Sequence, residues 1–227
     1  MKKAIILSVL FAFIMVPVVM ADQLTVRRLD GYFSGSGGEF TLSGGDLVNF
    51  QPNYANSTKN QGAYDPSIQS FCVETDEYVS IGGTYNFKVS GAAIEGGSGG
   101  PSPDPISKGT AWLYYQFLQG TLGYDYDSTK TRNSSAGDLQ KAIWYLEGES
   151  GGVNNAYVAL TIAKFVTEAG AKADNAGEFP VAVLNLYNLD GSLAQDQLVG
   201  VPEPASMLLL GSGLIGLAGF ARRKFRK

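Results

Sequence analysis

The chain has 227 residues, a net charge of −4, one Cys and no His. Its charges are segregated: both ends are basic, and the segment between them carries ten basic and 21 acidic residues, a net charge of −11. An acidic body repels phosphate backbones, so nucleic-acid binding is disfavoured. The lack of His excludes His-based triads and most zinc sites, and a single Cys excludes an internal disulfide.

Residues 1–21 have the pattern of a secretory signal peptide. Lys2 and Lys3 precede an apolar run, and Ala21 ends a cleavage-type sequence ahead of Asp22. We therefore predict cleavage near Ala21 and export. An uncleaved N-terminal membrane anchor is the alternative interpretation.

Residues 22–200 predict one mainly β domain with a helical insertion, arranged as a β-sandwich or barrel. Residues 84–89 alternate strictly between polar and apolar, and residues 180–187 are almost continuously apolar, which predicts a strand buried on both faces. A turn at 188–191 would pair that strand with the next one. The expected strands are 24–29, 39–50, 69–74, 84–89, 180–187 and 193–199.

The expected strand at 69–74 carries the only cysteine. Side chains alternate along a strand, so Cys72 and Glu74 share one face while Phe71 and Val73 share the other. A lone Cys in an exported protein has no internal partner with which to oxidise. The simplest interpretation of Cys72 is a small buried hydrophobe.

Three helices are expected in the second half, at 107–118, 138–147 and 156–169, and each ends at or near a glycine. The Gly/Ser/Pro-rich stretch 91–105 before them predicts a surface loop. In the middle helix, Ser135 and Asp138 form a possible capping box, which would place Gln140 near the first turn. Gln140 and Trp144 are four residues apart and so share a face, as they would in an ordinary amphipathic helix.

Cys72 and Gln140 stand in two short motifs, Phe71-Cys72-Val73-Glu74 and Leu139-Gln140-Lys141-Ala142-Ile143-Trp144. Together these resemble the thioester domains (TQXA type) of bacterial surface adhesins over about residues 68–150, although Glu74 stands where Asp or Asn is usual. The resemblance implies a β-sandwich or barrel of thioester-domain type. It also implies a thioester between Cys72 and Gln140, supported by Phe71, Glu74 and Trp144.

The implied chemistry is attack of the Cys72 sulfur on the Gln140 carboxamide carbon, with loss of ammonia. N–H groups at the start of the 138–147 helix are candidate donors to the developing oxyanion, and Trp144, Phe71 or Tyr145 would shield the product from water. An amine on a partner would then open the thioester in a single turnover. No catalytic residue, cofactor or metal site is expected; the pair Asp125 and Asp127 resembles a calcium loop only in its first positions.

The C-terminus reads Pro202-Glu203-Pro204, then an apolar run over 205–221, then a basic tail that includes Arg222 and Arg223. The apolar run is at the short limit for a membrane helix. This end resembles the PEP-CTERM sorting signal of Gram-negative bacteria that make exopolysaccharide and biofilm. The resemblance implies cleavage by a membrane transpeptidase, exosortase, so that residues 201–227 contact the membrane only before processing. A permanent single-span inner-membrane anchor is the alternative.

The expected protein is therefore an exported cell-surface or extracellular-matrix protein rather than an enzyme. Its partners would be an amine-bearing surface or matrix protein, or exopolysaccharide. A non-covalent structural or carbohydrate-binding biofilm matrix protein with a buried free Cys72 is the main alternative. An envelope hydrolase is a third interpretation, but the sequence offers no nucleophile–base pair for it.

Overall fold

The computed structural model describes residues 22–44, 47, 67–95, 100–127, 130–150 and 154–202. The predicted signal peptide at 1–21 lies outside the described residues. So do Glu203, Pro204, Arg222 and Arg223 of the predicted sorting signal and the apolar run between them. In the described part of the chain, no helix has the length and hydrophobicity needed to cross a bilayer.

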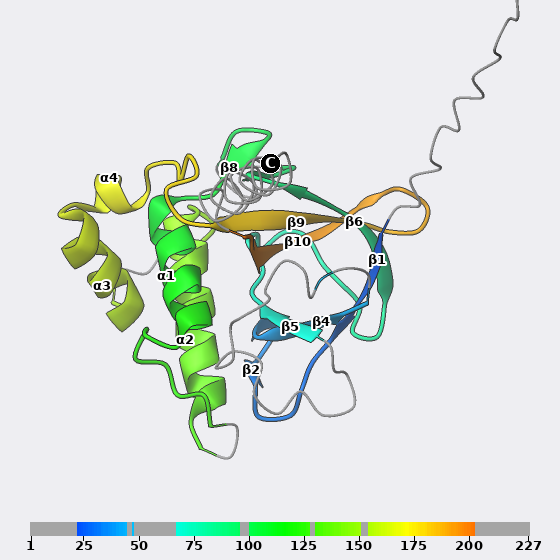
Figure 1. The fold of residues 1–227 in the computed structure, drawn as a ribbon, viewed down its shortest axis with the longest axis horizontal. Coiled ribbons are helices and arrows are strands. Elements are labelled where there is room, and N and C mark those ends of the chain that lie inside the picture. The colour runs from blue at the N-terminus through cyan, green and yellow to red at the C-terminus, as the bar shows by residue number, and fades with distance from the viewer. Residues whose placement is uncertain are drawn as a thin grey trace, which may run out of the picture.

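One large antiparallel sheet dominates the fold, in the strand order β10-β9-β6-β1-β4-β5 (Figure 1). Two short ribbons, β2 with β3 and β7 with β8, stand apart from it. The strands of the large sheet are β1 (Gln23–Arg27), β4 (Phe40–Ser43), β5 (Ser67–Ser70), β6 (Thr84–Ser90), β9 (Val181–Tyr187) and β10 (Leu193–Gly200). The ribbons consist of β2 (Phe33–Ser34), β3 (Gly37–Gly38), β7 (Ala92–Ala93) and β8 (Asp104–Pro105).

The two edge strands of the large sheet approach each other where β5 ends. Cys72 forms an isolated antiparallel bridge with Gln197 of β10. On either side of it, the Leu198 N–H donates to the Phe71 carbonyl at 3.0 Å and the Val73 N–H donates to the Asp196 carbonyl at 3.1 Å. These bonds tie the segment after β5 to β10 without extending into a ladder, so the described strands do not form a closed barrel.

Four helices lie together at one side of the sheet (Figure 1): α1 (Lys108–Gln119), α2 (Arg132–Leu146), α3 (Ala156–Phe165) and α4 (Glu168–Ala171). The Ser107 hydroxyl accepts the Thr110 N–H at the start of α1, and Gly120 ends that helix in the left-handed conformation at φ 72°. The helix α1 contacts β9 and β10, while α2 contacts the β2–β3 ribbon.

The buried apolar side chains form two clusters that divide the segment after β5 between them. Phe71 and Val73 pack in the cluster formed mainly by the helices. Cys72 packs in the cluster formed by the sheet. The predicted alternation of side chains is therefore present, although the regular strand ends at Ser70 rather than at Glu74.

The mainly β class is confirmed, and so are the strands at 84–89, 180–187 and 193–199. Other boundaries were wrong. The first part of the predicted strand 39–50 forms β4, which ends at Ser43; the third helix ends at Phe165, leaving Val166 83% exposed. The predicted loop 91–105 has paired ends, β7 and β8.

The largest boundary error is at α2, which begins at Arg132 rather than Asp138. Ser135 and Asp138 therefore lie inside the helix and form no capping box. The error has a physical origin: residues 132–137 are poor in strong helix formers, but Arg132 is fully buried against Glu39, and that tertiary contact extends the helix.

Candidate thioester site

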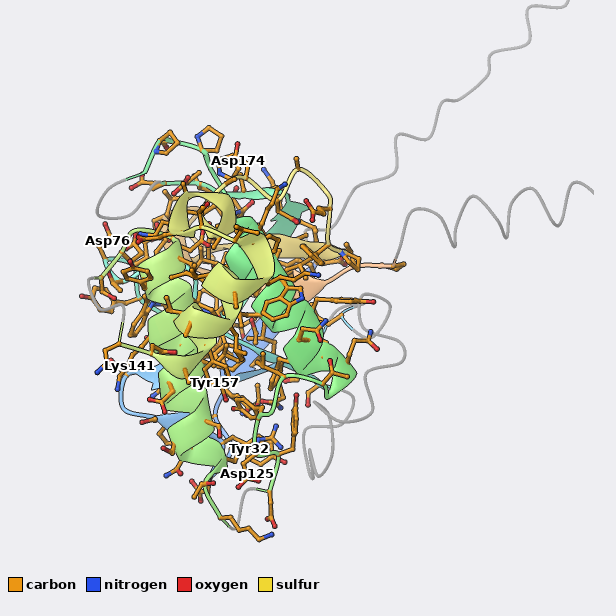
Figure 2. All side chains as sticks on the ribbon, turned by 90° about the vertical axis from the view of Figure 1, so that its left-hand side faces the viewer. Tyr32, Asp76, Asp125, Lys141, Tyr157 and Asp174 are labelled. Atoms are coloured by element: carbon orange, nitrogen blue, oxygen red, sulfur yellow. The ribbon has the colours of Figure 1, made fainter. Side chains whose placement is uncertain are left out.

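The predicted thioester pair comes from two elements that lie far apart in the sequence. Cys72 follows β5 at the point where the chain bridges to β10. Gln140 lies in the middle of α2, on the side of the helix that is buried. Figure 2 shows Lys141, the next residue, on the outer side of α2 and pointing away from the molecule.

Two hydrogen bonds join the Gln140 carboxamide to the backbone of Cys72. The Cys72 N–H donates to Gln140 Oε1 at 3.2 Å, and Gln140 Nε2 donates to the Cys72 carbonyl oxygen at 2.7 Å. Both residues are almost completely buried, with 0% and 1% of their surface exposed. The structure therefore holds the carboxamide against the residue that carries the thiol.

One of these bonds also bears on the oxyanion donors that the sequence predicts at the start of the helix. Because α2 begins at Arg132, the N–H groups around Gln140 belong to the helix interior rather than to its free first turn, and that prediction was wrong. The Cys72 N–H instead lies on Gln140 Oε1, which is the oxygen that gains negative charge when a nucleophile adds to the carboxamide.

Burial raises the pKa of the Cys72 thiol to about 12. The side chain of Trp144 and the charge of Arg28 oppose the rise, whereas the charge of Glu74 adds to it. The buried Trp144 Nε1 has no well-formed hydrogen bond. The thiol is accordingly neutral near pH 7, and its neighbours set how readily it loses its proton.

Gly37 allows the β2–β3 ribbon to approach Gln140 and Trp144. A Cβ atom at Gly37 would stand 2.6 Å from Gln140 Cγ and 2.8 Å from Trp144 Cη2, which is closer than non-bonded carbons can approach. Sequence reasoning missed Gly37, because nothing in its local sequence shows that a helix residue a hundred positions later packs on it.

Trp144 lines two pockets. The smaller, of about 200 Å³, is lined by Gln140 itself, together with Ser34, Gly35, Ser36, Gly37, Gly137, Lys141 and Trp144. The larger, of about 440 Å³, is lined by Arg28, Ser36, Phe40, Thr75, Tyr78, Val79, Ile81, Trp144 and Gln195. Gln140 therefore lines one of the two pockets directly, and Trp144 lines both.

Of the other predicted supporting residues, Phe71 and Tyr145 pack toward the helices. Phe71 packs edge-on against Phe117, with ring centres 5.2 Å apart, in the helical cluster rather than beside Cys72. The Tyr145 hydroxyl donates to Glu168 at 2.5 Å, toward α4. Glu74 is buried two residues after Cys72, and no group donates a hydrogen bond to either of its carboxylate oxygens.

The pair Asp125 and Asp127 does not have the character of a calcium loop. The Asp125 carboxylate accepts the Asp127 N–H at 2.9 Å and the Thr131 hydroxyl at 2.6 Å. Asp127 forms an ion pair with Lys130 at 3.0 Å. These carboxylates therefore stabilise the turn before α2.

Comparison with protein-family models identifies the C-terminal segment. Residues 200–227 match the model of the PEP-CTERM protein-sorting motif. This chain carries a sorting signal. The motif implies export, processing by an exosortase and association with the cell envelope. Comparison with the curated proteins and with the solved structures gives no match for the chain.

Proposed function

We propose that this exported, sorted protein forms an internal thioester between Cys72 and Gln140. We further propose that it uses the bond to attach covalently to an amine on a cell-surface or extracellular-matrix partner. The observation that carries the proposal is the pair of hydrogen bonds between the Gln140 carboxamide and the Cys72 backbone, in a buried setting.

The bond forms when Cys72 Sγ adds to Gln140 Cδ. The Cys72 N–H stabilises the negative charge that develops on Oε1, and the C–N bond then breaks. The thiol proton leaves with the nitrogen as ammonia, so the step needs no oxidant or cofactor. Amides resist thiols, but two reactants fixed in place gain up to about 7–11 kcal/mol over the same groups free in solution.

In the capture of a partner, Gln140 Cδ is attacked by an amine and the Cys72 sulfur is the leaving group. A primary amine, such as a lysine side chain, adds to Cδ and the C–S bond breaks. The sulfur takes the amine's proton, and an amide joins Gln140 to the partner. The half-buried Trp144 protects the bond from water until then, and the pocket that includes Gln140 offers the amine a route.

The second candidate is a non-covalent structural or carbohydrate-binding matrix protein. One observation favours it: with a pKa of about 12, the buried Cys72 thiol is stable and unreactive at neutral pH. In that case the hydrogen bonds to Gln140 serve only to attach α2 to the sheet. In both cases exosortase would act at the C-terminal motif, and the protein would function at the cell surface or in the matrix after processing.

The test is a thiol count before and after treatment with methylamine. The proposal predicts no reactive thiol in the unfolded, untreated protein. It predicts one thiol and one methylamine adduct at Gln140 after treatment of the folded protein. One thiol in the untreated, unfolded protein would overturn the thioester and leave the second candidate.

Matched variants separate this reaction from general amine labelling. Cys72→Ala and Gln140→Ala should each abolish the adduct. Gln119→Ala removes an exposed glutamine from α1 and should leave it unchanged. An adduct that persists in Cys72→Ala would show that the label does not come from a thioester.

A further inference from the structure

Three carboxylates converge beside the segment that carries Cys72. Glu74, Glu77 and Asp196 each place a carboxylate oxygen within 4.8 Å of the other two. Glu74 and Glu77 follow Cys72 along the chain, and Asp196 comes from β10 across the bridge. The pairing of β10 with β9 is irregular between Ala194 and Gln197, and this irregularity contains Asp196.

Glu74 is the unusual member of this group. Only 2% of its surface is exposed, and neither Oε1 nor Oε2 receives a hydrogen bond. A buried carboxylate without donors is costly unless something neutralises it. Burial is the largest cause that raises the pKa of Glu74; a side-chain hydrogen bond with Glu77, which needs a proton on one of the two acids, adds to the rise, and the negative charges of Glu77, Asp196 and Asp76 raise the pKa further.

Asp196, by contrast, is held firmly in place. Its Oδ2 accepts the Ile94 N–H at 2.9 Å and Asn185 Nδ2 at 2.8 Å, and its Oδ1 accepts the Leu186 N–H at 3.0 Å. A carboxylate oxygen has two lone pairs, so Oδ1, which accepts one hydrogen bond, keeps room for a further ligand. Asp196 is thus a fixed acceptor that faces an acid without a donor.

Protonation supplies only part of the hydrogen bonding that Glu74 lacks. One proton shared between Glu74 and Glu77 satisfies one oxygen of Glu74 and leaves the other without a donor. A divalent cation bound between them would contact all three carboxylates and offset their charge together. Figure 2 shows the neighbouring Asp76 at the outer margin of the molecule, and Glu77 is partly exposed, so the group can be reached from solvent.

We propose that Glu74, Glu77 and Asp196 form a calcium site. Calcium binds oxygen ligands at about 2.3–2.6 Å, so two oxygens on opposite sides of one ion are about 5 Å apart, and the spacing here fits within that limit. The all-oxygen ligand set excludes thiolate- and imidazole-preferring metals. Calcium is favoured over magnesium because it accepts irregular geometry and several protein carboxylates, whereas magnesium retains most of its waters.

The site would stabilise the connection between the two edges of the sheet. It joins the segment after β5 to β10 next to the Cys72–Gln197 bridge and the Val73–Asp196 hydrogen bond. Calcium would therefore hold Cys72 in place. The site does not depend on the thioester, since its ligands neither form nor contact that bond.

The test is calcium binding by the purified full chain after treatment with a chelator, measured by calorimetry. We expect one ion per molecule with a dissociation constant of about 10⁻³ M or below, the range of extracellular calcium modules. The melting temperature should rise steadily as calcium is added, because a ligand of the folded state alone stabilises it.

Glu74→Gln and Asp196→Asn should abolish both effects, whereas Asp125→Asn, which removes a half-buried carboxylate of the turn before α2, should keep both. Glu74→Gln is the decisive variant, because it preserves size and should melt at or above the temperature of the chelator-treated wild type. Absence of binding at about 10 mM calcium, well above that range, would overturn the proposal. So would undiminished binding by folded Glu74→Gln, or magnesium binding as tight as calcium binding.

Discussion

Two buried acids in this protein have opposite surroundings. Glu39 is fully buried and forms a two-point ion pair with Arg132, with both N–O distances at 2.7 Å. The Tyr124 hydroxyl donates to Glu39 as well. Glu74 is almost as deeply buried, but has no donor at all. The fold therefore supplies hydrogen-bond donors and a positive charge to Glu39. For Glu74 the described residues supply neither, and our proposal assigns that role to a calcium ion.

The satisfied pair has a structural role. Arg132 also donates to the Tyr126 carbonyl at 2.8 Å and lies 3.6 Å from the centre of the Tyr32 ring. Figure 2 shows Tyr32 and Asp125 toward the same, lower end of the molecule. Arg132 is the first residue of α2, so the pair fixes the start of the helix whose middle carries Gln140.

The same substitution at both acids tests the contrast most strongly. Glu39→Gln leaves the Arg132 charge buried and uncompensated, so we expect the free energy of unfolding to fall by about 3–5 kcal/mol. Glu74→Gln, measured with a chelator present, removes no donor and should cause no comparable loss. Urea denaturation of both variants measures the difference. Equal losses would contradict the contrast.

Gly37→Ala tests whether the packing on Gln140 is as close as the structure indicates. The new methyl group must displace the Gln140 and Trp144 side chains, so we expect a loss of stability of about 1–3 kcal/mol and slower amine capture. Gly91→Ala is the matched control, because a Cβ there has no neighbour within 4 Å. If both variants behave alike in denaturation and methylamine labelling, the close approach of β3 is unimportant.

Glu147 provides a pH-dependent test at a half-buried acid outside the proposed calcium site. Burial raises its pKa to about 7, although the Ser107 hydroxyl donates to it at 2.7 Å. Between about pH 4.5 and 7 the folded protein therefore holds this proton more tightly than the unfolded chain, so stability falls as pH rises. Because Glu147 is partly exposed, we expect a loss of at most about 1 kcal/mol.

Denaturation midpoints of wild type and Glu147→Gln over this pH range measure the effect. The variant should show the shallower slope, because it cannot bind the proton. A slope equal to that of wild type would assign the pH dependence to other groups.

The smallest effect is expected for an exposed ion pair close to Arg132. Lys130 lies 3.0 Å from Asp127, with 69% of its side chain exposed. Lys130→Ala should change stability by less than about 0.5 kcal/mol, because solvent screens such pairs. Thermal denaturation checks this, and a loss approaching that of Glu39→Gln would show that burial does not distinguish the two pairs.

Local sequence patterns predicted the parts of the fold that local patterns determine. Alternation identified β6, and the continuous apolar run identified β9 as a strand buried on both faces. The start of α2 was missed because it depends on Arg132 meeting a distant acid, Glu39. Cys72 and Gln140 were linked by resemblance of their motifs, since neither residue's periodicity indicates the other.

The acidic group and Gly37 were beyond the reach of the sequence for a related reason. Glu74 and Asp196 meet only because the segment after β5 bridges to the last strand of the sheet. Gly37 is required by the side chains of α2 rather than by its own backbone conformation. Such long-range contacts follow from the completed topology, and no local pattern encodes them.

The most direct test of the central claim is the intact mass of the purified protein. A Cys72–Gln140 thioester predicts a mass lower than that of the processed sequence by one ammonia. Cys72→Ala and Gln140→Ala should each show the full mass expected for their sequences, and Gln119→Ala should keep the deficit. A wild-type mass equal to the full sequence value, with a thiol that can be titrated after unfolding, would contradict the thioester.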